Sequence, residues 1–517
     1  MKKVNRIKIP GPPGTGKTHR LIHHYLNKEI NEYKTQQSKI LCVGFSNAAV
    51  DEARDRINKL YPGNEIQIFT LHALGRQTLN LDPKLLLKDK RWNEFKIVKG
   101  HGDIDFGGKE RSDSSYYEYN SDILKLIQYT KNKLKGRDDL GHMAFEMGLQ
   151  DDVNIDAAKQ LYQDIEDYKR DTKMYEFSDM IKQFIDNDCH PSLDAVFLDE
   201  AQDLNPLQWK MFYQIESTCD RSYIAGDDDQ TIFSFTAASP TEFINLKGEL
   251  DAQIQSNRVP INIHKEAMNV LSNITERLEK EWLPRGGDPG EVIDNLDLGD
   301  IDFEKENWMI LTRINKQQNN IIEHLESQEQ YFFCPRAELV TEKMIKAWRV
   351  WDRLNQGASV SGEEAALLYE QFIRWDNGKG NVSRGHADSK KLEKLYTVSL
   401  EELKENHGLL IEGDWKQLKM SDDQKNYIQG LLDKGEDLHQ DPRITVSTIH
   451  KAKGKECDNV ILFTDISYKP FHQAIKSDRF KDTEHRVWFV GVTRAKKKLF
   501  YMNNGNKYQY ITGEDIQ

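Results

Sequence analysis

The sequence predicts an α/β protein with two parallel-sheet cores, each of which is interrupted by a mostly helical insertion. Three observations lead to this fold class. A short apolar strand, a turn rich in glycine and proline, and the start of a helix follow one another within residues 7–26. Short apolar strands alternate with helical stretches in two separate regions, as they do in parallel sheets with crossover helices. Within each region lies a long, charged stretch of helical character, at residues 81–170 and 342–440.

Composition limits the class of protein before any motif is considered. The 517 residues are 38% hydrophobic and 30% charged, and no apolar run approaches the length of about 20 residues that spans a bilayer. Because the N-terminus leads directly into the first strand, we expect no signal peptide. The five cysteines are scattered and form no C-x-x-C pair, so we expect a reducing compartment, the cytoplasm, and no zinc site. Because the net charge is −12, contact with nucleic acid requires a local basic surface.

The first region supplies the elements of the first core. Helices are expected at residues 19–26 and 48–60, and Asp51 and Glu52 suit the positive N-terminal end of the second helix. The inserted stretch contains amphipathic segments at residues 121–135 and 156–168. Strands are expected at the start of residues 7–18 and at residues 39–45, 66–70, 193–199 and 221–226.

The second region repeats this alternation. Strands are expected at residues 308–313, 330–333, 444–449, 460–464 and 498–502. We therefore predict a first core of residues 1–80 and 171–250 and a second core of residues 251–341 and 441–517. The helical insertions are predicted at residues 81–170 in the first core and 342–440 in the second.

The glycine-rich turn has the pattern G-x-x-x-x-G-K-[ST]. Gly11 and Gly16 let the backbone fold tightly around an anion, and the following helix N-terminus adds partial positive charge. Lys17 can reach terminal phosphates, and the Thr18 hydroxyl can hold Mg²⁺. A chance glycine-rich loop is the alternative. The strand before the turn and the helix after it favour a phosphate-binding loop that serves ATP or GTP.

Acidic side chains follow two later strands. Asp199 and Glu200 end an apolar strand, which is the Walker B arrangement expected in a P-loop protein, with Asp199 on Mg²⁺ and Glu200 polarising the attacking water. The next strand ends in Gly-Asp-Asp-Asp-Gln at residues 226–230. Three acids gathered in one loop need a cation or a polar network. The amide of Gln230 can donate and accept hydrogen bonds, so it can sense a γ-phosphate. A plain acidic turn is the alternative for this loop.

Taken together and in order, these motifs resemble those of UvrD/Rep/PcrA-type superfamily 1A DNA helicases. The main motifs are GPPGTGKT (11–18), DEAQD (199–203), GDDDQ (226–230), STIHKAKGKE (447–456) and VGVTRAKKKL (490–499). Lesser motifs are FSNAAVDEARDRI (45–57), TLHALG (70–75), YEFSDMI (175–181) and SNRVP (256–260). The resemblance covers residues 11–502. It implies two RecA-like P-loop NTPase cores with ATP between them and a helical subdomain inserted into each.

The resemblance also implies roles for individual residues. The catalytic residues would be Lys17, Asp199, Glu200, Gln230, Arg258 and Arg494. Arg258 and Arg494 would act as arginine fingers from the second core, although position alone would suggest surface ion pairs. Mg²⁺ would bind Thr18 and Asp199. The nucleotide would contact Gly11, Pro12, Pro13, Gly14, Thr15, Gly16, Lys17, Thr18, His19, Gln230, Arg258, Glu456 and Arg494.

Single-stranded DNA is the track that the resemblance implies, because translocases of this kind combine backbone contacts with aromatic stacking. Candidate DNA contacts are Phe45, Asn47, Thr70, His72, Phe235 and His450. Each phenylalanine has an alternative place in the core.

The leading hypothesis is an ATP-driven motor that moves 3′→5′ on single-stranded DNA and unwinds tailed duplexes, with replication or repair proteins as partners. Thr236 stands where the family has an arginine, and the second insertion is short. These departures suggest a compact, divergent member and motivate a second hypothesis, a DNA-stimulated ATPase subunit or sensor, for example in a defence system. A third is a P-loop module without motor activity.

Overall fold

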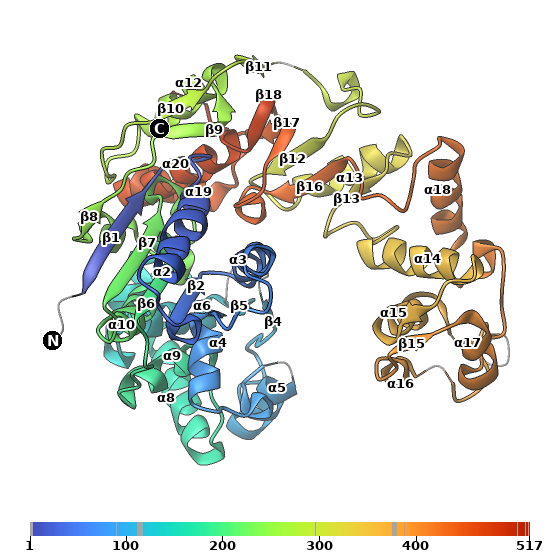
Figure 1. Ribbon diagram of the computed structural model, residues 1–517, viewed down its shortest axis with the longest axis horizontal. Coiled ribbons are helices and arrows are strands. Elements are labelled where there is room, and N and C mark those ends of the chain that lie inside the picture. Colours follow the sequence, from blue (N-terminus) through green and yellow to red (C-terminus); the bar gives the residue numbers. More distant parts are fainter. Residues whose placement is uncertain are drawn as a thin grey trace.

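The computed structural model places the two predicted cores side by side (Figure 1). The structure describes residues 4–88, 90–110, 117–294, 296–374, 380–386, 388–503, 505–511, 513–514 and 516. Each core is built around one six-stranded sheet in which every neighbouring pair of strands is parallel. The predicted fold class is thereby confirmed.

The first sheet has the strand order β3-β2-β6-β7-β1-β8. Its central strands are apolar on both faces; all four residues of β6, for example, are buried, as expected for a parallel sheet covered on both sides. This order brings the carboxyl ends of β1, β6 and β7 together at one edge. The strands are β1 (Asn5–Pro10), β2 (Ile40–Gly44), β3 (Gln67–Thr70), β6 (Ala195–Leu198), β7 (Arg221–Gly226) and β8 (Glu249–Leu250).

Several helices of the first core begin at side chains that cap them. The Ser46 hydroxyl accepts a hydrogen bond from the amide of Ala49 and so starts α3, and Thr70 starts α4 in the same way. The helix predicted at residues 19–26 is present, but Arg20–Leu26 is wound as a π-helix between α1 and α2. The helices are α1 (Lys17–His19), α2 (Asn27–Asn31), α3 (Asn47–Leu60), α4 (Leu71–Thr78), α9 (Phe177–Asp186), α10 (Pro206–Glu216) and α11 (Pro240–Asn245).

The first insertion packs around its own apolar cluster, which contains Trp92, Phe95, Leu126 and Leu161. Its helices are α5 (Lys90–Lys99), α6 (Asp122–Asn132), α7 (Leu140–Glu146) and α8 (Ile155–Thr172), and β4 (Gly108–Glu110) pairs with β5 (Tyr117–Tyr119).

The second sheet has the order β11-β18-β17-β12-β16-β13. Helices α12 and α20 contact each other against it, and one apolar cluster runs from the first core into the second. The strands are β11 (Glu291–Ile293), β12 (Trp308–Thr312), β13 (Phe332–Phe333), β16 (Ile444–Thr448), β17 (Cys457–Phe463) and β18 (Ala495–Met502), and β9 (Gln255–Pro260) pairs separately with β10 (Leu283–Arg285). The helices are α12 (Ile261–Leu271), α13 (Gln317–Ser327), α19 (Tyr468–Lys476) and α20 (Asp478–Val492).

The second insertion stands apart from the first core in Figure 1 and has its own apolar cluster. Its helices are α14 (Glu342–Asn355), α15 (Gly362–Phe372), α16 (Ser389–Leu392), α17 (Leu400–His407) and α18 (Asp422–Asp433), and β14 (Val360–Ser361) pairs with β15 (Thr397–Val398). The predicted residue boundaries of the four units stay predictions.

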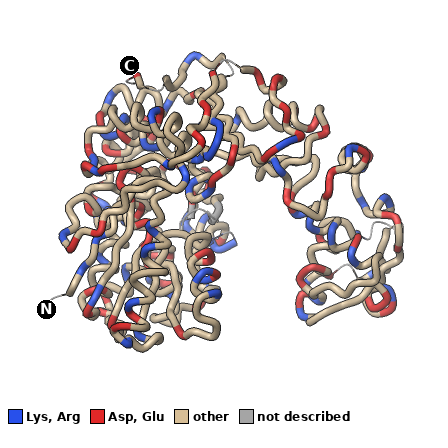
Figure 2. Tube along the Cα trace, turned by 45° about the horizontal axis from the view of Figure 1, so that its top comes forward, with Lys and Arg blue, Asp and Glu red and all other residues tan. Residues whose placement is uncertain are grey.

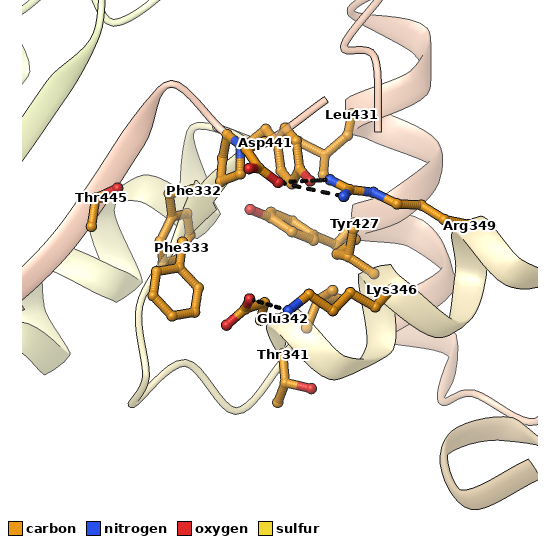
Figure 3. Close-up of a pocket in the computed structure, with 14 residues that line it drawn as sticks. Phe332, Phe333, Thr341, Glu342, Lys346, Arg349, Tyr427, Leu431, Asp441 and Thr445 are labelled. Atoms are coloured by element: carbon orange, nitrogen blue, oxygen red, sulfur yellow. Dashed lines mark hydrogen bonds and ion pairs between the residues drawn. The ribbon is translucent and has the colours of Figure 1, made fainter. Parts of the chain in front are cut away.

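A pocket of about 190 Å³ lies where the second core meets the second insertion (Figure 3). Phe332 and Phe333 reach it from β13, and Tyr427 reaches it from α18. Arg349 of α14 approaches Asp441, which lies on the segment that returns to the core, at 3.4 Å. The guanidinium therefore ties the chain leaving the core to the chain re-entering it. Among the described residues, no helix is long and apolar enough to cross a membrane.

Candidate nucleotide site between the two cores

The phosphate-binding loop leaves β1 and turns through two glycines with left-handed backbone conformations. Gly14 has φ 75° and Gly16 has φ 82°, which glycine adopts without the steric penalty of a Cβ atom. The ammonium of Lys17 donates to the carbonyl of Gly11 at 2.7 Å and, more weakly, to that of Pro12. Lys17 is thus folded back onto the loop from which it would reach a phosphate.

The parallel sheet explains why the loop and the two acidic motifs meet. Gly11 donates its amide to Gly226 at the end of β7, and Asp199 follows β6, the neighbour of β7. The Thr18 hydroxyl lies 2.5 Å from Oδ2 of Asp199. A hydroxyl and a carboxylate held this close are the hard oxygen donors that Mg²⁺ prefers, so the two residues fit the predicted metal site.

Burial sets the electrostatics of the two Walker B acids. Burial and the neighbouring carboxylate of Glu200 raise the pKa of Asp199 to about 6. Burial also opposes ionisation of Glu200, but the charges of Lys453 and Lys17 outweigh it and lower the pKa of Glu200. Gln202 donates to Glu200 at 2.6 Å and fixes its carboxylate. Glu200 is therefore the more readily ionised acid of the pair, which is the property that a general base needs.

The second core completes the site. A cavity of about 800 Å³ is bounded by Lys17 on one side and by Arg258 and Arg494 on the other. Most of the predicted nucleotide contacts line this cavity: Pro13, Gly14, Thr15, Gly16, Lys17, Thr18, His19, Gln230, Arg258, Glu456 and Arg494. Gly11 and Pro12 lie behind the lining, where their carbonyls hold Lys17. Asp199 lines an adjoining cavity of about 450 Å³ that shares Thr18 and Glu200 with the first.

Arg494 joins the cores directly. Only 1% of the residue is exposed, and its Nη2 donates to Oε1 of Gln230 at 3.1 Å. Burial and the charge of Arg258 lower the pKa of Arg494 to about 9. Arg258 pairs with Glu456, which is also among the predicted nucleotide contacts. The structure therefore brings both arginines to the cavity that Lys17 lines.

Strand β9 also packs against the phosphate-binding loop. The Ser256 hydroxyl donates to the carbonyl of Pro13 at 3.0 Å, and the amide of Asn257 donates to the carbonyl of Gly14 at 2.8 Å. These contacts carry Arg258 to the cavity, because it is the next residue of the same strand.

Several cations of the second core that contact motifs of the first were missed by the sequence reasoning. Lys453 pairs with Asp203 and donates to the carbonyl of Gln230 at 2.6 Å. Lys280 and Arg277 pair with the acidic loop at residues 227–229. Lys453 lies inside the motif at residues 447–456, so its place in that motif could have marked it as a candidate. Nothing in the charged stretch around Lys280 distinguished it from a solvated surface.

One candidate DNA contact, Phe45, lines the cavity that adjoins the nucleotide cavity. Phe45 is buried and its ring stacks on Phe233 at 5.2 Å, while the half-buried Phe235 lies 6.2 Å from the ring of His450 across the cores. The cavity of about 450 Å³ is lined by Phe45 together with the cationic residues Lys451, Lys453 and Lys455. Charges of both signs are interspersed along the whole trace (Figure 2), and the acids Glu52, Asp199, Glu200 and Asp203 line the same cavity as these lysines.

The other candidates differ in how available they are. Asn47 is exposed, but Thr70 is buried and its hydroxyl accepts from Ala73 as a helix cap. Burial lowers the pKa of His72 to about 4, so its imidazole is neutral. Its Nδ1 has no hydrogen-bond partner among the described residues, and the residue lines a small cavity together with Phe45.

Two parallel-sheet cores that share one cavity at a phosphate-binding loop define the chain as a two-core P-loop protein. The UvrD/REP helicase N-terminal domain matches residues 3–251, and the UvrD-like helicase C-terminal domain matches residues 381–505. The chain belongs to the UvrD-like helicase family.

Relatives align along most of their length. The chain is 21% identical to the ATP-dependent DNA helicase Rep of Buchnera aphidicola subsp. Schizaphis graminum, over 96% of this chain and 91% of the relative. It is 22% identical to a probable DNA helicase II homolog of Mycoplasma pneumoniae, over 95% and 81%. It is also 22% identical to the ATP-dependent DNA helicase UvrD2 of Mycobacterium tuberculosis, over 94% and 75%.

Proposed function

We propose that this chain is an ATP-dependent DNA helicase that moves 3′→5′ on single-stranded DNA and unwinds duplex DNA in replication, repair or recombination. The observation that carries the proposal is the cavity shared by Lys17, Arg258 and Arg494. If hydrolysis needs groups from both cores, its rate depends on how the cores lie, and a motor requires this dependence. Membership of the family and the names of the relatives support ATP and DNA as the substrates.

Phosphate binding is assigned to the loop and its lysine. Lys17 exchanges the carbonyls of Gly11 and Pro12 for phosphate oxygens, and the loop amides and the helix N-terminus complete the anion site. Thr18 and Asp199 hold Mg²⁺, which neutralises charge on the phosphate oxygens when bound.

Hydrolysis is assigned to one base and two cations. Glu200, oriented by Gln202, accepts the proton of the attacking water. Arg258 and Arg494 stabilise the negative charge that develops on the transferred phosphoryl group. Gln230 reports the state of the γ-phosphate to the second core through its bond to Arg494.

Coupling to DNA is assigned to the cavity of about 450 Å³ that adjoins the nucleotide cavity. Glu200 and Lys453 line the same cavity as Phe45, so a shift of the second core displaces Lys451 and Lys453 relative to the aromatic wall. Phe235 and His450, from different cores, would contact neighbouring bases or the backbone. We assign the protein to the cytoplasm, with replication or repair proteins as partners.

A second candidate is a DNA-stimulated ATPase subunit or sensor with little unwinding of its own. Thr236 replaces the family's arginine, so this position offers no positive charge to the nucleotide. The side chain is buried, and its hydroxyl donates to the carbonyl of Phe233.

Duplexes with a single-stranded 3′ tail, a 5′ tail or no tail distinguish these functions. The purified chain is expected to hydrolyse ATP faster with single-stranded DNA and to displace a strand only from the 3′-tailed duplex. Displacement only from 5′ tails would refute the polarity. DNA-stimulated hydrolysis without displacement would favour the subunit or sensor. ATP turnover that ignores DNA would refute both motor and sensor.

A further inference from the structure

The orientation of Gln230 depends on Asp227. Nε2 of Gln230 donates to Oδ2 of Asp227 at 2.7 Å, and Oε1 accepts from Arg494. Gln230 is 6% exposed and Asp227 is fully buried. A primary amide can rotate by half a turn and exchange its donor for its acceptor. The carboxylate of Asp227 prevents this exchange, because it accepts only the NH₂ group and so leaves Oε1 facing Arg494.

Asp227 is in turn held by Lys280. The Lys280 ammonium donates to Oδ1 of Asp227 at 2.6 Å, the oxygen that does not contact Gln230. The same ammonium pairs with Asp228 at 2.5 Å and with Asp229 at 2.9 Å. Its side chain is 5% exposed, and three buried carboxylates converge on it. An ammonium has three donors, and here each has an acidic partner.

These acids belong to the first core and their cations belong to the second. Lys280 and Arg277 lie on the segment between α12 and β10, and Arg486 of α20 donates to the carbonyl of Asp228 at 3.1 Å. Arg277 forms two bonds with Asp229, at 2.9 and 2.7 Å. The second core therefore grips the loop that carries Gln230.

We infer that Lys280 is a positioning residue for the reaction: it sets the orientation of Gln230 through Asp227 and links that orientation to the second core. The inference rests on the proposed function and extends its coupling step. Because the Lys280 ammonium holds Asp227 directly, a shift of the second core pulls on Asp227 and changes the geometry of the Gln230 amide. Arg277 grips the same loop without contacting Asp227.

The last difference supplies a matched control. Lys280→Met and Arg277→Met each remove one cation from the same acidic loop, so both leave a buried carboxylate with one fewer partner and both lower the unfolding midpoint. Only Lys280→Met releases Asp227. We expect it to lower the DNA-stimulated kcat for ATP by about tenfold or more, with KM for ATP within about twofold of wild type. Arg277→Met should keep kcat within about twofold of wild type.

A double-mutant cycle tests whether Lys280 acts through Gln230. In a Gln230→Ala background, Lys280→Met should lower kcat by less than about twofold, because the amide that it positions is already absent. An effect as large as that in wild type would contradict the inference.

A charge-balanced variant serves in case Lys280→Met does not fold. Asp228→Asn combined with Lys280→Met removes one negative and one positive charge but still leaves Oδ1 of Asp227 without the Lys280 donor. We expect a folded protein with the same loss of kcat. Wild-type kcat in a folded Lys280 variant, or equal losses in Lys280→Met and Arg277→Met, would overturn the inference alone. A wild-type chain that hydrolyses no ATP would overturn the proposed function, and the inference with it.

Discussion

At the residue scale, the contact between the cores contains buried acids whose ionisation is unfavourable. Burial raises the pKa of Asp203 to about 7, although the Lys453 ammonium beside it acts in the opposite direction. Oδ1 of Asp203 has no hydrogen-bond partner among the described residues. The pair of Asp203 and Lys453 thus connects two motifs across the cleft while leaving one acceptor unsatisfied.

This acid gives the stability of the protein a defined dependence on pH. The folded state holds the Asp203 proton more tightly than the unfolded chain does, so its contribution is present below pH 4 and is lost as the pH rises to about 7. Relative to Asp203→Asn, the wild type should lose up to about 4 kcal/mol of unfolding free energy over this range. Denaturant unfolding of both proteins at several pH values measures the difference. A difference that stays constant with pH would contradict the raised pKa.

The meeting of motif residues that follow strands could be predicted from the sequence, because parallel strands place their carboxyl ends at one edge of the sheet. Lys17, Asp199 and Gln230 meet for this reason. Lys280 could not be predicted, because its contacts depend on how the two cores pack. The three adjacent acids signalled that a cation was needed, but not which one.

At the scale of elements, the contact between the phosphate-binding loop and β9 depends on the absence of a side chain at Gly14. A Cβ atom there would lie 2.5 Å from Cβ of Arg258 and 2.7 Å from the hydroxyl of Ser256. Gly16 also has a positive φ, but its nearest neighbour, Cβ of His19, would lie 3.9 Å away.

Substitutions at the two glycines therefore distinguish the effect of backbone strain from the effect of losing the contact with β9. Gly14→Ala and Gly16→Ala share the strain of a left-handed alanine, whereas only the first also forces the loop away from the second core. We expect Gly14→Ala to be less stable than Gly16→Ala by about 1–3 kcal/mol, the usual effect of overpacking. Urea unfolding midpoints measure this. Equal midpoints would show that the loop and β9 do not pack as described.

The local sequence pattern predicted the positions of strands and helices more reliably than it predicted whether a helix is an α-helix or a π-helix. Strands predicted at residues 39–45, 193–199 and 308–313 correspond to β2, β6 and β12 with shorter bounds, since each predicted range included flanking loop residues. The π-helix at Arg20–Leu26 could not be foreseen, because its residues favour an ordinary helix by composition. The pairing of β9 with β10, away from the main sheet, likewise depends on packing.

At the scale of the whole molecule, two cores enclose the nucleotide cavity and grip each other through charged contacts. Arg494 to Gln230, Lys453 to Asp203 and Lys280 to the acidic loop all cross the boundary between them. A continuous apolar cluster lies beneath these contacts. Occupation of the nucleotide cavity would therefore be transmitted to the adjoining cavity through the movement of whole cores, since the linking side chains are held by partners in both cores.

The most direct test of the account compares ATP turnover with single-stranded DNA in wild type, Lys17→Ala and Arg494→Ala, while binding of a fluorescent ATP analogue is measured separately. Circular dichroism first establishes that each variant is folded. Lys17→Ala should lose nucleotide binding and turnover together. Arg494→Ala should still bind nucleotide, yet its turnover should fall by about 10³-fold, because a charge from the second core is missing in the transition state. Turnover near the wild-type rate in Arg494→Ala would contradict hydrolysis shared between the cores.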